Sequence, residues 1–406
     1  MYCMSTYKGI IFCLVTNAGG AKEMKDVKTK GLVAKISNDF GSRLYQVLKN
    51  ESSDLLFSPL SVEIIMLSMW RAAGGKTEKE IGRVLGISRS NRVLWMGFRH
   101  LMRELGKPKI GVTVSIANKL YIKNNITLKE DFKNTIKKFL YCEAEGIDFG
   151  GENNLAADTI NGWIERKTNN MIKNVFGKEC LTADAVIVLV NALYFRGNWS
   201  SHFNVHSTTK EKFFKDKDHK TEVEMMSQES EFSYAEREFK ILKMNYTDGY
   251  SMLILLPNEV DGITNLENSL PDLDWREVNS ILKPLIMKVH IPKFKIEAKM
   301  HMTEKLKELG MSLVFSPSAN LSRMSDQPSY VTSVVQKTLI DVRECGTEAA
   351  AASVSEVKAK SSSAVPVFRA DHPFIFAVQH EVSGVIIFLG RYSGPTSPLA
   401  QKKKGR

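Results

Sequence analysis

The sequence predicts a mixed α/β chain of the α+β class, organised around large antiparallel sheets. Helical spacing of apolar residues fills much of the first half of the chain, whereas strand patterns dominate the second half. The run from Val186 to Phe195 is continuously apolar, which is typical of a strand covered on both faces. Helices that come mostly before strands argue against a doubly wound sheet, and the lack of internal repeats favours one domain.

The predicted helices rest on apolar residues that recur three and four positions apart. In the first of them, Val33, Ile36 and Phe40 share one face. Pro59 suits the first turn of the second helix, and Thr77 with Glu80 indicates a capping box that opens the third. The predicted helices are Lys30–Lys49, Pro59–Ala73, the helix that opens at Thr77, Asn91–Leu105, Leu128–Leu140, Ala156–Phe176 and Met302–Leu309.

The predicted strands rest on alternation or on short apolar runs. From Val334 to Val342, Gln336 and Thr338 share one side with apolar residues, while Lys337 and Asp341 take the other, as in a half-buried strand. The predicted strands are Leu55–Phe57, Val112–Tyr121, Val186–Phe195, Thr221–Phe232, Ile241–Tyr246, Ser251–Leu256, Met287–Ile296, Val334–Val342, Val365–Phe368 and Val385–Leu389.

The composition is that of an ordinary globular protein, because 43% of the residues are hydrophobic and 25% are charged. A formal charge of +11 is compatible with acidic partners such as glycosaminoglycans or membrane surfaces. Neither zinc-finger spacing nor an aromatic RNA-binding motif is present, so we expect no nucleic-acid partner. Beyond the start of the chain, no apolar stretch is long enough to span a bilayer.

The first residues predict secretion. Lys8 precedes the apolar run Gly9–Val15 and small residues up to Ala21, so we expect residues 1–21 to be a signal peptide of a secreted, extracellular protein; a frayed N-terminus is the alternative. Residues 396–406 are predicted to be a basic, disordered tail. Five N-x-S/T sequons add support and are candidate glycosylation sites: Asn50, Asn125, Asn198, Asn245 and Asn320.

No motif indicates catalysis. The eight histidines are scattered, and neither a metalloprotease H-E-x-x-H motif nor a G-x-S-x-G nucleophile elbow occurs. The cysteines that would remain after signal removal, Cys142, Cys180 and Cys345, are odd in number and scattered, so they form no disulfide framework. We therefore expect no enzyme activity, no metal site and no obligatory cofactor.

The chain changes character abruptly after Val342. An alanine run such as Ala349–Ala352 usually indicates a helix, but no large apolar residue recurs at helical spacing between Gly346 and Ser363. The alternative is a mobile loop that can become a strand, because small side chains on both faces would fit between two existing strands. So long a loop in a compact domain indicates a function.

Two runs near this loop resemble the serpin family. Glu344–Ser353 resembles the hinge of the serpin reactive-centre loop, and Phe368–Phe376 resembles the C-terminal signature of the family. Shorter matching blocks are Phe57–Ser61, Asn161 with Trp163, Val190–Phe195 with Trp199, Met225–Met226, Leu255–Pro257, Ile291–Phe294, and Gly384 with Phe388–Arg391. The resemblance implies a monomeric serpin domain over residues 30–395, with three β-sheets, eight or nine helices and an exposed reactive-centre loop at about residues 344–368.

The resemblance also implies the reactive bond. Counting seventeen residues from Glu344, the usual hinge length of inhibitory members, places the bond between Lys360 and Ser361, with Lys358–Ala359 as the alternative. Lysine before the bond would pair with a carboxylate in the pocket of an extracellular trypsin-like serine protease. The implied hinge consists of Gly346, Thr347, Glu348, Ala349, Ala350, Ala351, Ala352 and Ser353.

The resemblance to serpins implies that two predicted strands are neighbours in the central sheet, namely Val186–Phe195 and Val334–Val342. Gln336 stands where many members carry histidine, and it keeps a donor and an acceptor but cannot titrate. The residues implied for the region where the strands part are Ser58, Ser61, Asn191, Gln336 and Trp199.

The helix Asn91–Leu105 lies where some serpins bind heparin-like sulphated polysaccharides. A solvated basic face explains the same residues, and we favour that interpretation because a basic helix alone is a weak signal. The candidate polyanion-binding residues are Arg92, Arg99, Arg103, Lys107 and Lys109.

The resemblance implies inhibition by a suicide-substrate mechanism. A serine protease attacks the loop and forms an acyl-enzyme, and insertion of the loop into the central sheet then traps the protease. The alternative is a non-inhibitory serpin-like binding or carrier protein. Such members often lose the small hinge residues, which this chain keeps, so we favour inhibition.

Overall fold

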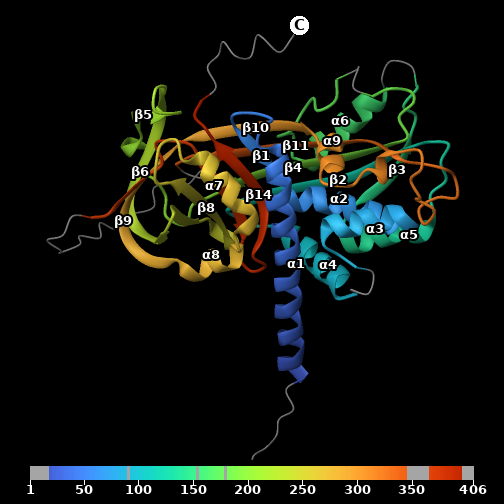
Figure 1. Ribbon diagram of the computed structural model, residues 1–406, viewed down its shortest axis with the longest axis horizontal. Coiled ribbons are helices and arrows are strands. Elements are labelled where there is room, and N and C mark those ends of the chain that lie inside the picture. The colour runs from blue at the N-terminus through green and yellow to red at the C-terminus, as the bar shows by residue number, and fades with distance from the viewer. Residues whose placement is uncertain (1–17, 89–91, 152–154, 178–180, 345–364, 396–406) are drawn as a thin grey trace, which may run out of the picture.

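The computed structural model describes residues 18–88, 92–151, 155–177, 181–344 and 365–395. Within these ranges the chain forms nine α-helices and fourteen strands in two sheets, which confirms the mixed α/β class (Figure 1). The helices are α1 Ala18–Leu48, α2 Pro59–Ala72, α3 Gly75–Leu85, α4 Arg92–Leu105, α5 Glu130–Leu140, α6 Leu155–Lys167, α7 Ile263–Ser269, α8 Trp275–Ile281 and α9 Thr303–Glu308.

A five-stranded sheet carries the predicted central pair of strands. Its order is β10 (Phe294–His301), β11 (Val331–Val342), β4 (Ile187–Gly197), β2 (Val112–Lys123) and β3 (Glu143–Ile147). The two central strands, β11 and β4, run parallel to each other, whereas each pairs with its other neighbour in antiparallel fashion. The strands predicted over Val186–Phe195 and Val334–Val342 therefore lie side by side.

Alternate residues of β4 enter two separate cores. Leu189 and Leu193 pack in the main core, which also contains α2, whereas Val190 and Tyr194 pack in a second core under α6. Because side chains alternate across a strand, a strand covered on both faces needs apolar residues throughout. This double covering explains the continuous apolar run.

The second sheet has nine strands and unites two groups that were expected as separate sheets. Strand β6 is long enough to pair with β5 at its start, β9 along its middle and β7 at its end, so it makes the two groups continuous. The order is β1 (Leu55–Phe57), β14 (Val385–Tyr392), β13 (Phe374–His380), β8 (Tyr250–Pro257), β7 (Phe239–Asn245), β6 (Lys220–Glu236), β9 (Lys283–Pro292) and β12 (Val367–Arg369), with β5 (Thr209–Phe214) beside β6.

Four predicted elements differ from the structure by more than a few residues at their ends. The first helix begins at Ala18, twelve residues before its predicted start at Lys30. The single strand Met287–Ile296 is two strands in different sheets, β9 and β10, with Lys293 between them. The predicted capping box is wrong: α3 begins at Gly75, and the Thr77 hydroxyl instead accepts a hydrogen bond from the backbone of Asn320. Helix α6 ends at Lys167, and left-handed backbone at the following asparagines ends the helix earlier than apolar spacing indicated.

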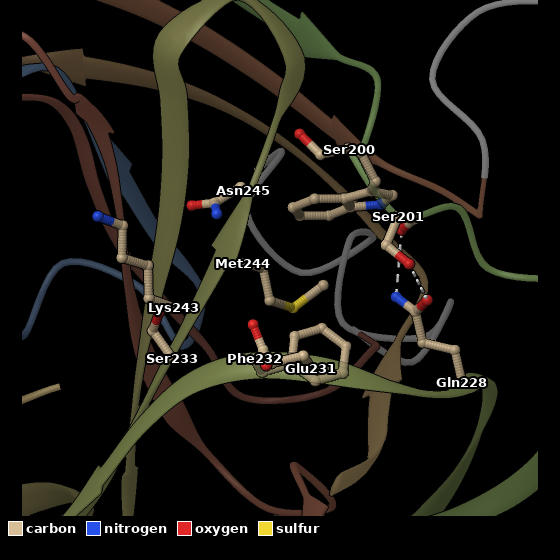
Figure 2. A pocket seen from close by; sticks show the side chains of 10 residues that line it. Ser200, Ser201, Gln228, Glu231, Phe232, Ser233, Lys243, Met244 and Asn245 are labelled. Atoms are coloured by element: carbon tan, nitrogen blue, oxygen red, sulfur yellow. Dashed lines mark hydrogen bonds between the residues drawn. The ribbon is translucent and has the colours of Figure 1, made fainter. Parts of the chain in front are cut away.

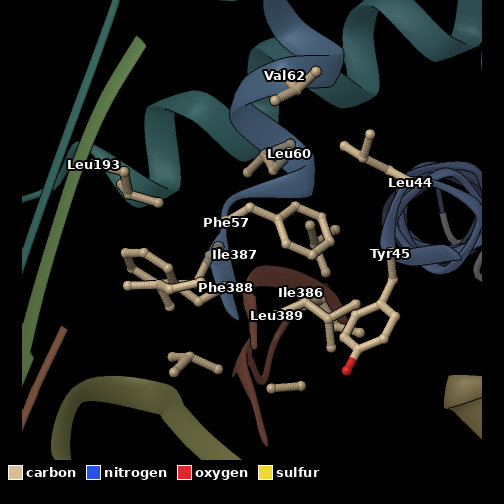
Figure 3. Packing of buried hydrophobic residues seen from close by; sticks show 14 of the residues in the cluster. Leu44, Tyr45, Phe57, Leu60, Val62, Leu193, Ile386, Ile387, Phe388 and Leu389 are labelled. Atoms are coloured by element: carbon tan, nitrogen blue, oxygen red, sulfur yellow. The ribbon is translucent and has the colours of Figure 1, made fainter. Parts of the chain in front are cut away.

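The main core joins the first helices to the last strand (Figure 3). Leu44 and Tyr45 of α1 face Phe57 of β1 and the run Ile386–Leu389 of β14, which lies more than three hundred residues further along the chain. Strand β1 pairs with β14 in antiparallel register, so the two ends of the described chain are held in one hydrogen-bonded and apolar unit. One face of the five-stranded sheet packs against the same core, through Leu189 and Leu193 of β4.

Candidate functional site

A row of amide side chains crosses the middle of the five-stranded sheet. Gln336 of β11, Asn191 of β4 and Asn118 of β2 are register partners on adjacent strands. The Gln336 amide nitrogen donates to the side-chain oxygen of Asn191 at 2.6 Å, and Asn191 donates to Asn118 at 2.6 Å. At most 3% of each residue is exposed, so these bonds connect three strands inside the protein.

Gln336 also ties the sheet to the start of α2. Its side-chain oxygen accepts from the backbone N–H of Ser58 at 2.9 Å, and its amide nitrogen donates to the Ser58 carbonyl at 3.1 Å. The Ser58 hydroxyl caps α2 by accepting from the N–H of Ser61, and Thr338 donates to the carbonyl of Leu56. The structure therefore places Ser58, Ser61, Asn191 and Gln336 next to one another.

Buried side-chain hydrogen bonds join β4 and β11 at the middle of the sheet. Buried polar groups must keep their partners, so each of these hydrogen bonds holds the strands together. The bond is the polar contact in a strand pair that is otherwise largely apolar, since the adjacent register partners are Val335 and Val190. We therefore take the Gln336–Asn191 contact as the candidate functional site.

Trp199 lies apart from this row, at the end of the sheet. Its indole N–H donates to the carbonyl of Arg343 at 2.8 Å, and its ring stacks on Tyr246 with centroids 4.0 Å apart. Arg343 follows Gln336 by seven residues, which corresponds to roughly 23 Å along a strand. Trp199 therefore holds the point where the chain leaves β11, rather than the middle of the strand pair.

Glu344, the last described residue before the predicted loop, is anchored at the same end. Thr208 donates to its carboxylate at 2.9 Å, and the Lys293 ammonium lies 3.3 Å away. Burial raises the pKa of this carboxyl, but hydrogen bonds from its own backbone, Thr208 and Lys293 outweigh burial and leave the pKa below its ordinary value. Glu344 is therefore held as a carboxylate beside a cation.

A pocket of about 200 Å³ opens next to Trp199 (Figure 2). Met244 and Phe232 form its apolar part, while Ser201 and Gln228 hydrogen-bond to each other across its rim. Because these polar groups are already paired, we assign the pocket no ligand.

The reactive-bond and hinge predictions lie outside the described residues. These are Lys360, Ser361, Lys358, Ala359 and the hinge from Gly346 to Ser353, and they stay predictions from the sequence. The structure places the two ends of this segment: Glu344 sits at the end of the five-stranded sheet, and β12 pairs with β9 in the other sheet.

The five sequons differ in accessibility. Asn198 is half-buried, and its side-chain oxygen is buried with no partner among the described residues. Because the other four asparagines are exposed, Asn198 is the least accessible and hence the least suitable acceptor. The four exposed asparagines are Asn50, Asn125, Asn245 and Asn320.

The basic residues on and after α4 contact different groups. Arg99 lies over the ring of Phe139, Lys107 pairs with Glu104 at 2.7 Å, and Lys109 reaches the carbonyl of Asp248. Arg103 is also beside Glu104, while the side chain of Arg92 lies outside the described part. The described residues contain no group of three or more histidines, cysteines or acids placed to hold a metal ion.

Comparison with known proteins decides the family. The family model described as "Serpin (serine protease inhibitor)" matches residues 35–395. The chain belongs to the serpin family. It is 31% identical to human Serpin B4 over 375 residues, which cover 86% of this chain and 96% of the relative.

Solved serpin structures match the fold. Serpin48 of the insect Tenebrio molitor, described as a highly specific serpin, is 30% identical, with a TM-score of 0.78 over 90% of this chain and 98% of its own. Native protease nexin-1 with heparin is 26% identical, with a TM-score of 0.80 over 91% of this chain and 100% of its own. The serpin fold predicted from the sequence is thus confirmed.

Family membership also confirms that the chain is not an enzyme, since the family model describes inhibitors of serine proteases. Among the described helices, none combines the length and the apolar character needed to cross a membrane. Sequence reasoning missed three site residues: Asn118, Thr208 and Lys293. Asn118 lies on β2, whereas Thr208 and Lys293 lie between elements, and each meets its partner only in the folded chain.

Replacing Gln336 by leucine is expected to destabilise this serpin by about 3 kcal/mol, because the Ser58 backbone and the Asn191 oxygen would lose buried partners. The midpoint of urea unfolding of the uncleaved protein measures the change. Gln336→His keeps a donor and an acceptor and should lose less at pH 8. Equal losses in the two variants would show that side-chain volume, rather than hydrogen bonding, matters here.

Proposed function

We propose that this serpin is a secreted suicide-substrate inhibitor of a trypsin-like serine protease. The observation that carries the proposal is the parallel pairing of β4 and β11 in the centre of the sheet. A strand that entered between them in the opposite direction would form antiparallel ladders on both sides. The segment after Glu344 follows β11 in the chain, and in this mechanism it would reverse direction and take that place.

Insertion would exchange one set of interactions for a larger one. The Gln336–Asn191 bond and one parallel ladder would break, while the new strand would form two ladders. Roughly a dozen additional backbone hydrogen bonds at about 0.5–1.5 kcal/mol each make on the order of 10 kcal/mol available. This free energy would drive displacement of a protease attached to the loop.

The chemistry would belong to the protease. Its serine oxygen attacks the carbonyl carbon of Lys360, the bond to the nitrogen of Ser361 breaks, and the new amine leaves with the proton from the general base. An ester then joins Lys360 to the protease. Insertion of the segment from Thr347 onward would carry this ester away before water completes the reaction.

Secretion is supported by the predicted signal at residues 1–21 and by exposed sequons such as Asn50 and Asn125, both of which lie in turns. N-terminal sequencing of protein recovered from the medium of expressing eukaryotic cells tests this part. A chain retained inside the cell with residues 1–21 intact would contradict it.

An adduct with trypsin that survives SDS is the expected result for the unmodified serpin. Lys360→Ala should lower the rate of trypsin inhibition about a hundredfold, because the charge pair in the protease pocket is lost. Lys358→Ala, two residues away, is the matched control and should retain the rate. A lower inhibition rate in Lys358→Ala alone would assign the reactive bond to Lys358. Cleavage of the unmodified serpin without an adduct would instead indicate a non-inhibitory binding protein.

A further inference from the structure

A groove of about 260 Å³ lies between α4 and α5, which pack against each other. Trp95 and Met96 of α4 line one side, Thr135 and Phe139 of α5 line the other, and Arg71 at the end of α2 closes one end. Trp95 stacks on Trp70 with centroids 5.9 Å apart and meets the edge of Phe139 at 6.1 Å. The aromatic walls are therefore fixed by packing.

Apolar side chains face solvent beside this groove. Met96 is 48% exposed and Val93 is 51% exposed, and their spacing of three places them on the same face of α4. Trp95 is the only one of the five tryptophans that is not buried. Exposed apolar groups gathered around an aromatic groove are typical of a surface that binds a partner.

Two cations lie close to the Phe139 ring, and a third belongs to the lining of the groove itself. The Arg99 guanidinium carbon is 5.8 Å from the centroid of Phe139, and the Lys138 ammonium is 5.5 Å from it. Arg71 adds a third cation, whose described partner, Asp131, has a side chain that is 81% exposed. Two cations this close to Phe139, which lines the groove, make the potential there positive, and this would attract an anion.

We propose that this groove binds an acidic peptide segment of another protein. An apolar side chain of the peptide would insert between Trp95 and Phe139, and its carboxylates would pair with Arg99 and Lys138. The apolar walls favour a peptide over a sulphated polysaccharide, which carries charge but no apolar side chain. The proposal is independent of protease inhibition, because none of these residues belongs to the loop or to the strand junction.

Trp95 fluorescence provides the test, since the other four tryptophans are buried. The probe is an acetylated octapeptide of six glutamates around a central Phe-Leu pair, added to the full-length serpin. Binding should protect Trp95 from iodide quenching, and Trp95→Phe should lose this response. The double variant Arg99→Gln/Lys138→Gln should weaken binding about tenfold, because two ion pairs are removed.

The matched control, Arg103→Gln/Lys107→Gln, removes two cations of the same region that lie beside Glu104 rather than over the Phe139 ring, and should bind the peptide normally. Retention of the circular dichroism spectrum shows that the variants are folded. Three results would overturn the proposal. These are no peptide binding, equal binding by both double variants, and equal binding of a peptide with Ser-Gly at its centre. Protection of Trp95 by heparin but not by the peptide would overturn it too.

Discussion

A Glu63→Gln variant is expected to gain stability relative to the parent serpin as the pH rises from 5 to 9. Glu63 lies on α2 and is 0% exposed. The Ser37 hydroxyl of α1 donates to one of its carboxylate oxygens, and the other oxygen has no partner among the described residues. A charge at this position would be buried without adequate compensation.

Burial raises the pKa of Glu63 to about 8, although the hydrogen bond from Ser37 and the charge of Arg43 oppose the rise. The folded protein therefore keeps a proton that the unfolded chain releases above its ordinary pKa of about 4.5. Because the folded state binds more protons between these values, the free energy of unfolding falls as the pH rises through this window. Glutamine has no proton to lose and escapes this effect.

The difference in free energy of unfolding between the variant and the parent should change by about 4 kcal/mol between pH 5 and pH 9. Urea unfolding at several pH values measures it. Glu130→Gln, which removes an acid with a 73% exposed side chain from α5, is the control and should leave the pH profile unchanged. If the difference in free energy of unfolding between Glu63→Gln and the parent stayed constant with pH, the pKa of Glu63 would be the same in the folded and unfolded states.

The central pair of strands could be predicted because its signal is local. A strand buried on both faces needs apolar residues at every position, so Val186–Phe195 indicated β4 without knowledge of its neighbours. The alternation of Val334–Val342 likewise indicated β11, although the strand begins three residues earlier. That the two strands are adjacent came from the family resemblance, since neither pattern specifies a partner.

Features that depend on register were not predictable from the sequence. Asn118 resembles any polar residue in an alternating strand until β2 is placed beside β4, where it faces Asn191. The run around Lys293 looked like one strand because apolar alternation continues through the point where the chain passes from one sheet to the other. Lys293 therefore gave no indication that it would lie beside Glu344.

Helical spacing also fails to show what a charged side chain contacts. Arg103 and Lys107 were grouped with Arg99 because all are basic and near one helix, yet the first two lie beside Glu104, while Arg99 faces an aromatic ring on α5. The aromatic groove depends on contacts between α4 and α5. Those contacts depend on how the two helices pack together. The amphipathic pattern of one helix does not specify its partner.

Thr347→Arg is expected to abolish the SDS-stable trypsin adduct while the loop is still cleaved. The reason lies in the two faces of the sheet. At the level of Leu193 and Tyr194, β4 is buried against the main core on one face and against the core under α6 on the other. A strand entering beside β4 would therefore have both sets of side chains enclosed, and an inserted arginine would bury an unpaired charge at a cost of several kcal/mol.

Slower insertion would let water hydrolyse the acyl-enzyme first, so trypsin should be released active and the serpin should be recovered clipped after Lys360. Gel electrophoresis gives the ratio of adduct to clipped serpin, and Thr347→Ser, which keeps a small side chain, is the matched control. The clipped parent should melt well above the intact protein, whereas clipped Thr347→Arg should gain less, because its loop remains outside the sheet. A normal adduct yield from Thr347→Arg would contradict this mechanism, because trapping of the protease would then not require the segment to enter between β4 and β11.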